Sequence, residues 1–409
     1  MNVLVVGSGG REHALVRKLR ESPRVDRIFC APGNGGISLD AECVDLRDFA
    51  ELAEFAKKND AFTVVGPDDA LADGIAEAFA GLPIFAPTKR AAIIEYSKSY
   101  SKALMKKYNI PTAAYEVFDN YADALAYARK SAHPLVVKAD GLALGKGVTV
   151  CQNLKQSEDA LKEAMLDKKF GDSGDTVVIE EFLTGREVSV LAFCDGKTIV
   201  PMASAQDHKQ VFDGNQGANT GGMGTISPSP YYTDEMAKTC FSEIFEPTLK
   251  ALAAEGREFV GVLFFGLMIT ADGVKVIEYN ARFGDPETQV VLLRLKTDLF
   301  DILEACVFGT LDKIKIEWED NAAACVILAS GGYPQAYKKG YEISELSHVP
   351  NVFHAGTIVR DGKIFTNGGR VLGVAGVGDT LEKAVSAAYE GVSKIHFEGV
   401  HYRKDIGKV

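Results

Sequence analysis

The first hundred residues alternate short apolar runs with amphipathic segments, and this alternation constrains the fold more than any other feature. The runs are NVLVVG, RIFCAP, AFTVVG and PIFAP, and the segments between them include REHALVRKLRES and LRDFAELAEFAKK. Apolar runs of this length suit buried strands, and the longer segments repeat with helical spacing. The pattern therefore predicts βαβ units that build a parallel sheet.

The pattern changes twice further along the chain. A helix is expected at 98–108 and a strand–helix–strand–strand module up to residue 183, before mixed strands and loops and a final region of short strands with one helix. At 409 residues the chain exceeds what one core usually serves. We predict an α/β fold, α+β in part, with a Rossmann-like parallel-sheet domain at 1–102, a central region at 103–315 with a lid subdomain at about 112–183, and a small α+β domain at 316–409.

Charge and cysteine content narrow the classes of partner. The formal net charge is -11 and the pI is about 5.3, which argues against nucleic acid or an anionic membrane as a partner. The seven cysteines are scattered without a CxxC pair, as expected of buried thiols in a reducing compartment. No apolar run reaches the ~20 residues of a membrane-spanning helix, and we expect no signal peptide, because the strand expected at 2–7 leaves no room for a basic segment or a small-residue cleavage site. We expect a cytoplasmic monomer or weak dimer that binds small molecules.

The opening VLVVGSGGREH places Gly7 and Gly9 after a strand and before a helix, where bare amides can approach a phosphate. It is only half of a dinucleotide fingerprint, because Glu12 occupies the third glycine position and the next strand ends at Ala31-Pro32 without an acid for a ribose. A simple tight turn from strand to helix is the structural alternative for these glycines. Two neighbouring features favour an anion site: Arg11 and the loop Pro32-Gly33-Asn34.

A glycine-rich turn lies between two expected strands at 134–150, PLVVKADGLALGKGVTV. Lys138 ends the first strand and Lys146 sits in the turn. The turn is not a Walker A loop, because Gly141 and Gly145 are separated by three residues and Gly147 stands where Ser or Thr would hold magnesium. It is typical of a lid that folds over a nucleotide, although an ordinary hairpin with solvated lysines has the same composition.

Two further segments carry candidate ligand contacts. VIEEFLTGREVS at 178–189 offers a strand edge for an adenine and Glu187 for ribose hydroxyls, although acids at a strand end are often only solvated. The glycine-rich stretch 204–224 reads as a disordered segment or surface flap on composition. Alternatively, its Asp207, His208 and Lys209 could reach a substrate.

The most informative segment is VIEYNARFGDPETQ at 276–289. On a strand, Glu278, Asn280 and Arg282 lie two apart and so face the same side. Oxygen ligands from Glu278 and Asn280 suit Mg²⁺, and Arg282 could stabilise charge on a phosphoryl or carboxyl group. An exposed polar strand is the structural alternative. The histidines show no zinc-ligand spacing.

In chain order, these features resemble the ATP-grasp superfamily: Lys98, Lys138, the GLALGKG turn, IEEFL with Glu187, and the strand with Glu278, Asn280 and Arg282. More narrowly, several segments are similar to the signatures of the phosphoribosylamine–glycine ligase family (glycinamide ribonucleotide synthetases). They are VGSGGREHAL, APGN, VVKADGLALGKGV, IEEFLTGREVS, QDHK, NTGGMG and RFGDPETQ. The similarity extends to the closing segment, FHAGT through TNGGRVL to YRKDIG.

This resemblance implies an ATP-dependent ligation of glycine to 5-phosphoribosylamine through a glycyl phosphate, in purine (IMP) synthesis, with Mg²⁺ or Mn²⁺. The implied ATP contacts are Lys98, Lys138, Lys146, Glu180, Glu181, Phe182, Leu183 and Glu187. The implied metal ligands are Glu278 and Asn280. The implied catalytic residues are Arg282, Lys138, Asp207 and Lys209. The implied substrate contacts are Gly9, Gly10, Arg11, Gly33, Asn34, Asp207, Asn219, Thr220, Gly221, Gly222 and Asp285.

The chain departs from the family pattern at three places. Asp68-Asp69-Ala70 replaces the usual Glu-x-Pro, Ala218 stands where Pro normally precedes the Asn-Thr-Gly-Gly loop, and Ile226 replaces an aromatic residue. Two other functions stay open at this point. Another ATP-grasp ligase, such as a dipeptide ligase or a bicarbonate-dependent carboxylase, would keep the central motifs but lack RFGDPET. A regulatory nucleotide-binding protein with an inactive site would not need Glu278, Asn280 and Arg282 together.

Overall fold

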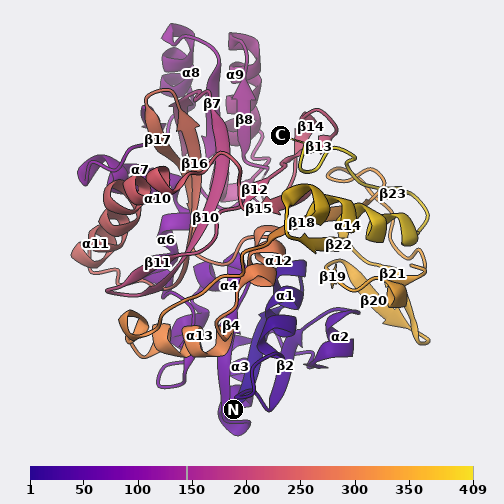
Figure 1. Cartoon of the computed structure of the whole chain (residues 1–409). Helices are drawn as coiled ribbons and strands as arrows, with labels where there is room; N and C mark the ends of the chain where they lie inside the picture. Colours follow the sequence, from indigo (N-terminus) through magenta and orange to yellow (C-terminus); the bar gives the residue numbers. More distant parts are fainter. Residues whose placement is uncertain (144–145, 409) are drawn as a thin grey trace.

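A parallel sheet forms the N-terminal lobe, as the alternating pattern predicts (Figure 1). The computed structural model describes residues 1–143 and 146–408. The strand order is β3-β2-β1-β4-β5. The strands are β1 (Asn2–Gly7), β2 (Arg27–Pro32), β3 (Glu42–Cys43), β4 (Ala61–Val65) and β5 (Ile84–Phe85). Because β1 is central and its residues 3–7 are buried, its carboxyl end opens at Gly7, shortly before the first helix begins at Gly10.

Short helices surround this sheet. They are α1 (Gly10–Leu19), α2 (Ile37–Asp40), α3 (Phe49–Lys58), α4 (Asp68–Asp73), α5 (Ile75–Ala78) and α6 (Lys89–Tyr96). Side chains cap two of them: Asp48 accepts hydrogen bonds from two amides at the start of α3, and Thr88 accepts one at the start of α6. The helix expected at 98–108 is α7 (Lys98–Lys107), which Ser97 caps.

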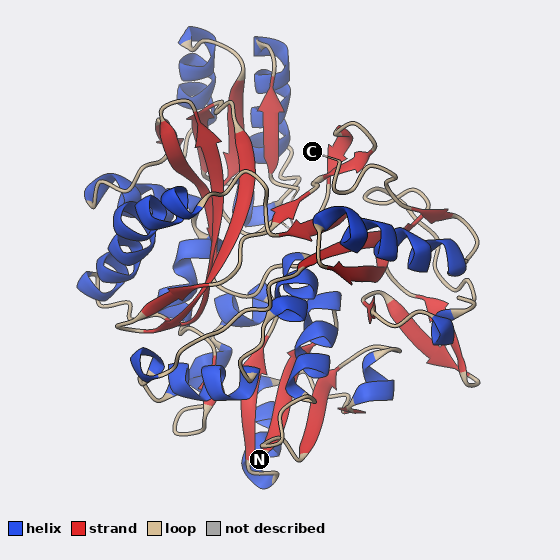
Figure 2. Cartoon of the chain, in the orientation of Figure 1, coloured by secondary structure: helices blue, strands red, loops and turns tan. Residues whose placement is uncertain are grey.

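The lid is a four-stranded antiparallel sheet with helices on one side, at the top of Figure 2. Its strand order is β6-β9-β7-β8. The strands are β6 (Tyr115–Phe118), β7 (Leu135–Ala139), β8 (Val148–Cys151) and β9 (Val177–Glu181). The helices are α8 (Tyr121–Lys130), α9 (Leu154–Leu161), η1 (Lys162–Leu166) and η2 (Gly171–Gly174). A small separate core, including Ala124, Leu135 and Leu161, holds the lid together.

A second antiparallel sheet, in the order β11-β10-β16-β17, forms the centre of the molecule. Its strands are β10 (Arg186–Asp195), β11 (Ile199–Pro201), β16 (Val260–Thr270) and β17 (Gly273–Asn280). The pairing of β16 with β17 shifts register at Gly266, opposite Glu278, so that Ile277 is the extra residue of a β-bulge. The accompanying helices are α10 (Asp234–Cys240), η3 (Phe241–Phe245), α11 (Glu246–Ala254), α12 (Glu287–Val291), η4 (Leu292–Arg294), α13 (Leu299–Val307) and η5 (Leu311–Lys313).

The C-terminal sheet combines strands from both sides of residue 316. Its order is β12-β15-β18-β22-β19, and β23 pairs with β18. Its strands are β12 (Gln206–Asp207), β15 (Gly224–Ser227), β18 (Ala322–Ser330), β19 (Val352–His354), β22 (Arg370–Gly378) and β23 (Val400–His401). Helix α14 (Leu381–Lys394) packs on β22, and η6 (Leu346–His348) and the hairpin β20 (Thr357–Arg360)–β21 (Lys363–Thr366) complete the region. Strands β12 and β15 thereby attach the loop 204–224 to the C-terminal region.

The stretch 204–224, for which composition favoured disorder or a flap, forms a hairpin of β13 (Gln210–Phe212) and β14 (Gln216–Asn219). The buried Arg403 guanidinium donates to Asp405 at 2.8 Å, to the Gln210 carbonyl at 3.1 Å and to Asn215 at 3.0 Å. Asp405 also accepts from the Gly214 amide at 2.7 Å. A strap of residues 400–408 therefore holds this hairpin, which composition alone could not reveal.

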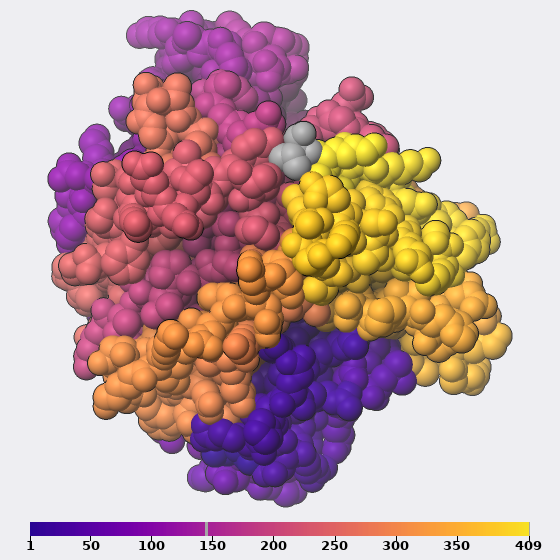
Figure 3. Space-filling view, viewed as in Figure 1, coloured from indigo at the N-terminus to yellow at the C-terminus, as the bar shows by residue number. Residues whose placement is uncertain are grey.

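The N-terminal lobe packs against the C-terminal region. In the space-filling view the indigo N-terminal residues lie against orange and yellow C-terminal residues (Figure 3). The His354 amide donates to His13 Nδ1 at 2.8 Å, and Arg17 donates to the carbonyls of Pro350 and Val352.

The seven cysteines are free thiols, and six of them are buried. Within residues 1–143 and 146–408, we find no helix that combines the length and the hydrophobicity needed to cross a bilayer.

We predict that Arg403→Met loosens the β13–β14 hairpin without unfolding the molecule. Loss of the charge-assisted bonds should raise the rate of amide hydrogen exchange in residues 210–219 roughly 30-fold, equivalent to about 2 kcal/mol of local stability. Lys404→Met is the control, because that side chain is exposed. Unchanged exchange in the hairpin of the Arg403 variant would show that the strap does not hold it.

Candidate active site

A cleft of about 1500 Å³ lies between the lid, the central sheet and the β13–β14 hairpin. Most of the residues predicted from the sequence line it. They are Arg11, Lys98, Lys138, Lys146, Glu180, Glu181, Phe182, Leu183, Glu187, Asp207, Lys209, Asn219, Thr220, Gly221, Glu278, Asn280, Arg282 and Asp285. Gly145 of the glycine-rich turn lies outside the described residues. The structure thus brings together side chains that lie up to 274 positions apart in the sequence.

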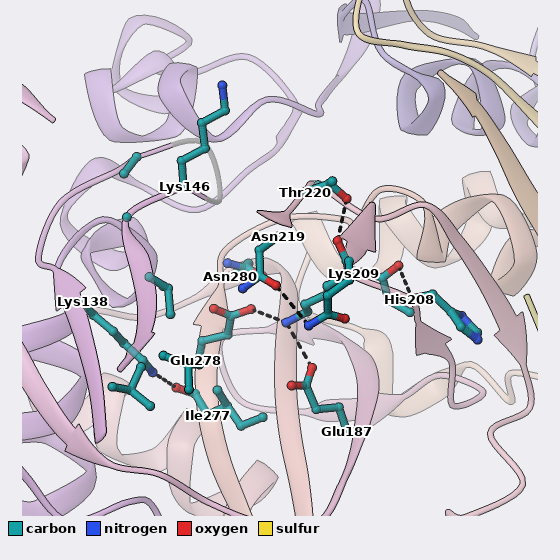
Figure 4. Close-up of a pocket in the computed structure, with 18 of the residues that line it drawn as sticks. Lys138, Lys146, Glu187, His208, Lys209, Asn219, Thr220, Ile277, Glu278 and Asn280 are labelled. Atoms are coloured by element: carbon teal, nitrogen blue, oxygen red, sulfur yellow. Dashed lines mark hydrogen bonds and ion pairs between the residues drawn. The ribbon is translucent and has the colours of Figure 1, made fainter. Parts of the chain in front are cut away.

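One wall of the cleft is made by β17 and the residues that follow it. Glu278, Asn280 and Arg282 are partly exposed to the cleft, whereas the intervening Tyr279 and Ala281 are buried. The side of β17 that carries Glu278 faces Lys138 and Lys209 (Figure 4). The Lys209 ammonium, together with Lys138 and Lys98, lowers the pKa of Glu278 to about 2. Glu278 therefore stays ionised throughout the physiological range.

The Arg282 guanidinium forms an ion pair with a buried acid, Glu95. Its Nη2 lies 2.9 Å from Oε1 of Glu95, and the other Glu95 oxygen accepts from the Ala281 amide at 2.7 Å. Burial raises the pKa of Glu95, and the Arg282 charge opposes that shift. Among the described residues, the buried Nε of Arg282 has no acceptor. Since a buried donor without a partner is costly, this group is suited to an oxygen atom of a ligand.

Lys138 and Lys98 approach the cleft from different elements. Lys138, on β7, lies 2.9 Å from Glu180 Oε1 and donates to the Ile277 carbonyl at 3.1 Å. Lys98, at the start of α7, donates to the Gly141 carbonyl at 3.0 Å and to the Asp140 carbonyl at 3.3 Å. Burial lowers the pKa of Lys98. Both ammonium groups are therefore fixed by backbone carbonyls, that of Lys138 by β17 of the central sheet and that of Lys98 by the residues that follow β7.

The lid and β9–β10 form the outer part of the cleft. Lys146 is exposed on the lid, and its side chain extends away from Glu278 (Figure 4). The Glu181 amide already donates to the Ala114 carbonyl, and its carboxylate pairs with Lys275 at 3.2 Å. Phe182 is exposed, so the strand edge beyond Glu181 is open to the cleft. The side chain of Glu180 faces inward to the lysines, which makes it a partner of Lys138.

Lys209 stands between two acids and beside two more. Its ammonium lies 3.3 Å from Glu278 and 3.4 Å from Glu187 (Figure 4). Asp207 and Glu287 also line the cleft here. Burial and the charge of Glu287 raise the pKa of Asp207 well above its usual range, and burial raises the pKa of Glu287. Glu287 accepts a hydrogen bond from the Ser189 hydroxyl at 3.1 Å.

The Asn219–Gly222 loop crosses the cleft close to Asp207. The Thr220 hydroxyl donates to the Lys209 carbonyl at 2.8 Å and accepts from the Gly222 amide at 3.0 Å. Gly222 has φ +109°, and a Cβ there would lie 2.6 Å from Oδ1 of Asp207. Only glycine suits this position. The Arg370 guanidinium donates to the Gly221 carbonyl and, at 2.8 Å, to the Asp285 carbonyl.

A second, smaller cavity of about 350 Å³ adjoins the cleft at the carboxyl end of the parallel sheet. Its lining includes Gly9, Gly33 and Asn34, with Asp285 and Arg370 shared with the larger cleft. Asn34 donates to the Ser8 carbonyl at 2.9 Å and to the His354 carbonyl at 2.8 Å, joining the N-terminal and C-terminal lobes.

The two other N-terminal candidates have different surroundings. Arg11 Nε lies 2.6 Å from Glu12, and its Nη1 donates to the Phe283 carbonyl at 2.9 Å, so it faces the larger cleft. Gly10 is buried, and a Cβ there would lie 2.7 Å from Gln289. Gly10 therefore serves close packing of α1 in this structure.

The donor set on β17 fits a divalent cation. Glu278 is ionised, and Asn280 lines the same cleft. The Lys209 ammonium between Glu278 and Glu187 shows that this position stabilises a cation. Among residues 1–143 and 146–408, no three His, Cys, Asp or Glu side chains are grouped to hold a metal. Two protein ligands completed by water and phosphate oxygens are the pattern that Mg²⁺ favours.

Sequence reasoning missed four charged residues of the site: Lys102, Glu95, Glu287 and Arg370. Glu287 and Arg370 lie within the quoted segments RFGDPETQ and TNGGRVL, so the signal was present but was assigned to their neighbours. Lys102 and Glu95 lie on helices, where charged residues normally face solvent. Only their burial in the folded chain distinguishes them.

Three family models match the chain almost end to end. They describe the N domain (residues 1–95), the ATP-grasp (A) domain (96–288) and the C domain (323–409) of phosphoribosylglycinamide synthetase. Phosphoribosylamine–glycine ligases of Clostridium acetobutylicum and Halalkalibacterium halodurans are 50% and 51% identical, over 100% of this chain and 100% and 96% of theirs.

Solved structures give the same picture. The crystal structure of phosphoribosylamine–glycine ligase from Thermotoga maritima superposes with a TM-score of 0.88 at 33% identity, covering 99% of this chain and 100% of that one. The biotin carboxylase domain of Hydrogenobacter thermophilus 2-oxoglutarate carboxylase, in complex with MgADP, ADP and bicarbonate, has a TM-score of 0.72 at 17% identity and covers 98% of this chain and 91% of that one. This second similarity concerns the fold alone.

We predict that Lys209→Met raises the pKa of Glu278, because Lys209 is the largest cause of its lowering. A depressed carboxyl pKa contributes stability above the ordinary value of 4.5 that is lost as the pH falls towards 2, and the variant should lose much of that contribution. A carboxyl NMR titration of Glu278 measures the shift. Lys209→Arg, which retains the charge, should titrate like the wild type, and an unshifted methionine variant would refute the pairing.

Proposed function

Because the chain belongs to the family of phosphoribosylglycinamide synthetases, we propose that its cleft aligns ATP, glycine and phosphoribosylamine along the wall formed by Glu278, Asn280 and Arg282. The chain is an ATP-dependent ligase of purine biosynthesis that joins glycine to 5-phosphoribosylamine. The observation that carries the assignment of the site is that this wall faces Lys138 and Lys98 across one cleft.

The chemistry explains why the cleft needs these charges. An oxygen of the glycine carboxylate attacks the γ-phosphorus of ATP, ADP leaves, and glycyl phosphate forms. The amine nitrogen of phosphoribosylamine then attacks the acyl carbon, phosphate leaves and the nitrogen loses a proton, which gives N1-(5-phospho-D-ribosyl)glycinamide. Such transfers need positioning and charge stabilisation more than covalent catalysis, and the acyl phosphate must be kept from water.

The ATP contacts follow from the elements that surround the cleft. Lys98 and Lys138 neutralise the phosphates, and Lys146 reaches them when the lid closes. The open strand edge at Phe182 and Leu183 takes the adenine, and Glu187 takes the ribose. The Glu181 amide is already bonded to Ala114, so the adenine contact falls on the two residues after it.

The family uses ATP together with a divalent ion, and Glu278 and Asn280 are its proposed ligands, for Mg²⁺ or Mn²⁺. When bound, the ion supplies positive charge beside the phosphate oxygens. Glu278 contributes an ionised oxygen and Asn280 a neutral one, and Lys209 keeps Glu278 deprotonated.

Glycine fits between Arg282 and the two buried acids Asp207 and Glu287. The unpartnered Nε of Arg282 suits an oxygen of the glycine carboxylate or of the acyl phosphate. Asp207 and Glu287 are both disfavoured as charged groups by burial, and the ammonium group of glycine would compensate them. Lys209 supplements Arg282 as a catalytic cation. The loop Asn219–Gly222 encloses this end of the cleft.

The smaller cavity suits the phosphoribosylamine. It combines the Gly9 and Gly33–Asn34 turns at the end of the parallel sheet, where anions commonly bind, with Asp285 and Arg370 towards the larger cleft. Arg11 lines the larger cleft beside this cavity and remains a proposed contact of the same ligand, whereas Gly10 packs α1 against Gln289. The amine end of the ligand would then point towards glycine.

Other aspects of the sequence interpretation stay predictions. They are the domain limits 1–102, 103–315 and 316–409, the monomer or weak dimer, the absence of nucleic-acid and membrane partners, and the cytoplasmic location. The seven free thiols support a reducing compartment.

The assay that tests the function follows ADP release with each co-substrate withheld in turn. We expect turnover only when glycine and phosphoribosylamine are both present, and Glu278→Ala should lower it at least ~100-fold. Turnover supported by bicarbonate without either co-substrate would favour a carboxylase instead.

We further predict that Glu287→Gln raises the KM for glycine roughly 10-fold and leaves the KM for ATP within about twofold, because a charge-assisted contact is lost at one end of the cleft only. Glu243→Gln, at an exposed position of η3, is the matched control. A uniform change in all KM values would contradict the glycine assignment.

A further inference from the structure

Lys102 is a buried lysine that the reaction, as described above, does not use. It lies on α7, and its side chain is 2% exposed. Its ammonium lies 3.0 Å from Glu180 Oε2 and donates to the Thr112 hydroxyl at 2.8 Å. That hydroxyl in turn donates to the Val276 carbonyl of β17 at 2.7 Å. A buried ammonium is costly, so these three contacts call for an explanation.

The contacts of Lys102 close a ring with those of Lys138. Glu180 Oε1 lies 2.9 Å from Lys138, and Lys138 donates to the Ile277 carbonyl at 3.1 Å. The chain of contacts therefore begins at Val276 and ends at its neighbour Ile277.

The ring ends at the β-bulge. The register shift between β16 and β17 makes Ile277 the extra residue, so its carbonyl is available to Lys138. The next residue is Glu278, the proposed metal ligand. A ring that pins Val276 and Ile277 thus fixes the point from which Glu278 projects into the cleft.

The ring carries more positive than negative charge. Two ammonium groups share one carboxylate, and the side chains of Glu180 and Lys138 are only 4% and 5% exposed. With Lys102 on one oxygen of Glu180, the other oxygen is left for Lys138, and within the ring the two positive charges exceed the one negative charge. Without Lys102, Glu180 would neutralise Lys138 and draw it away from an incoming phosphate.

We propose that Lys102 is a positioning residue for the nucleotide: through Glu180 it holds Lys138 and the bulge before Glu278 in place. The inference rests on the proposed assignment of Lys138 and Glu278 to the ATP end of the cleft. Lys102 acts through Glu180 and Lys138, at the ATP end of the cleft. Its substitution should therefore weaken the binding of ATP and its metal, and leave the binding of glycine and phosphoribosylamine unchanged.

The test compares Lys102→Met with Lys102→Arg. The methionine variant should raise the KM for ATP at least ~10-fold, with the KM for glycine within about twofold of the wild type. The arginine variant keeps the charge and should recover ATP binding to within about threefold. Lys106→Met, at an exposed position one turn further along α7, is the control and should behave as the wild type.

A double-mutant cycle separates positioning from general destabilisation. The double variant Lys102→Met/Glu180→Gln also removes the carboxylate charge of Glu180 that Lys102→Met alone leaves without its partner. Affinity for an ATP analogue is measured by calorimetry. The loss of affinity in the double variant should be clearly smaller than the sum of the losses in the two single variants. This pair also serves if Lys102→Met alone fails to fold, because it should still bind the analogue at least ~10-fold more weakly than the wild type.

Three results would overturn the inference: an unchanged KM for ATP in Lys102→Met, equal rises in the KM of every substrate, or wild-type affinity in the double variant. Its failure is distinguishable from failure of the proposed function. Analogue binding reports on Lys102 directly, whereas the proposed function fails only if the wild type shows no ADP release that depends on glycine and phosphoribosylamine.

Discussion

Three lysines from three different elements keep Glu278 ionised inside the cleft, and the rest of the site depends on that charge arrangement. Lys98 begins α7, Lys138 lies on β7 of the lid, and Lys209 follows β12. Glu278 can attract a cation only while it is deprotonated, and the lysines can attract a triphosphate only while they are not all neutralised. The architecture serves this requirement by bringing the lid, the central sheet and the C-terminal sheet to one cleft.

Each of these lysines is restrained by groups far away in the sequence. Lys138 is held by Glu180 and by the carbonyl that the bulge at Ile277 leaves free. Lys209 precedes the β13–β14 hairpin, which Arg403 fastens from the other end of the chain. Such restraint before any ligand binds reduces the ordering that binding and reaction would otherwise require.

Much of this could be predicted from local patterns. Alternating apolar runs predicted the parallel sheet, and the spacing of Glu278, Asn280 and Arg282 predicted their shared face, because strand periodicity is a local property. The pairing of Arg282 with Glu95 could not be predicted, because the two residues are joined only by tertiary packing. The bulge at Ile277 leaves no mark in the sequence, and the ordered hairpin depends on Arg403, nearly two hundred residues away.

Binding of Mn²⁺ in the presence of a non-hydrolysable ATP analogue, followed by electron paramagnetic resonance, reports directly on the proposed metal site at Glu278 and Asn280. Glu278→Gln should weaken Mn²⁺ binding at least ~10-fold, whereas Glu187→Gln, which removes the other acid in an ion pair with Lys209, should change it much less. Equal Mn²⁺ affinity in the wild type and Glu278→Gln would show that this wall does not hold the metal–nucleotide complex.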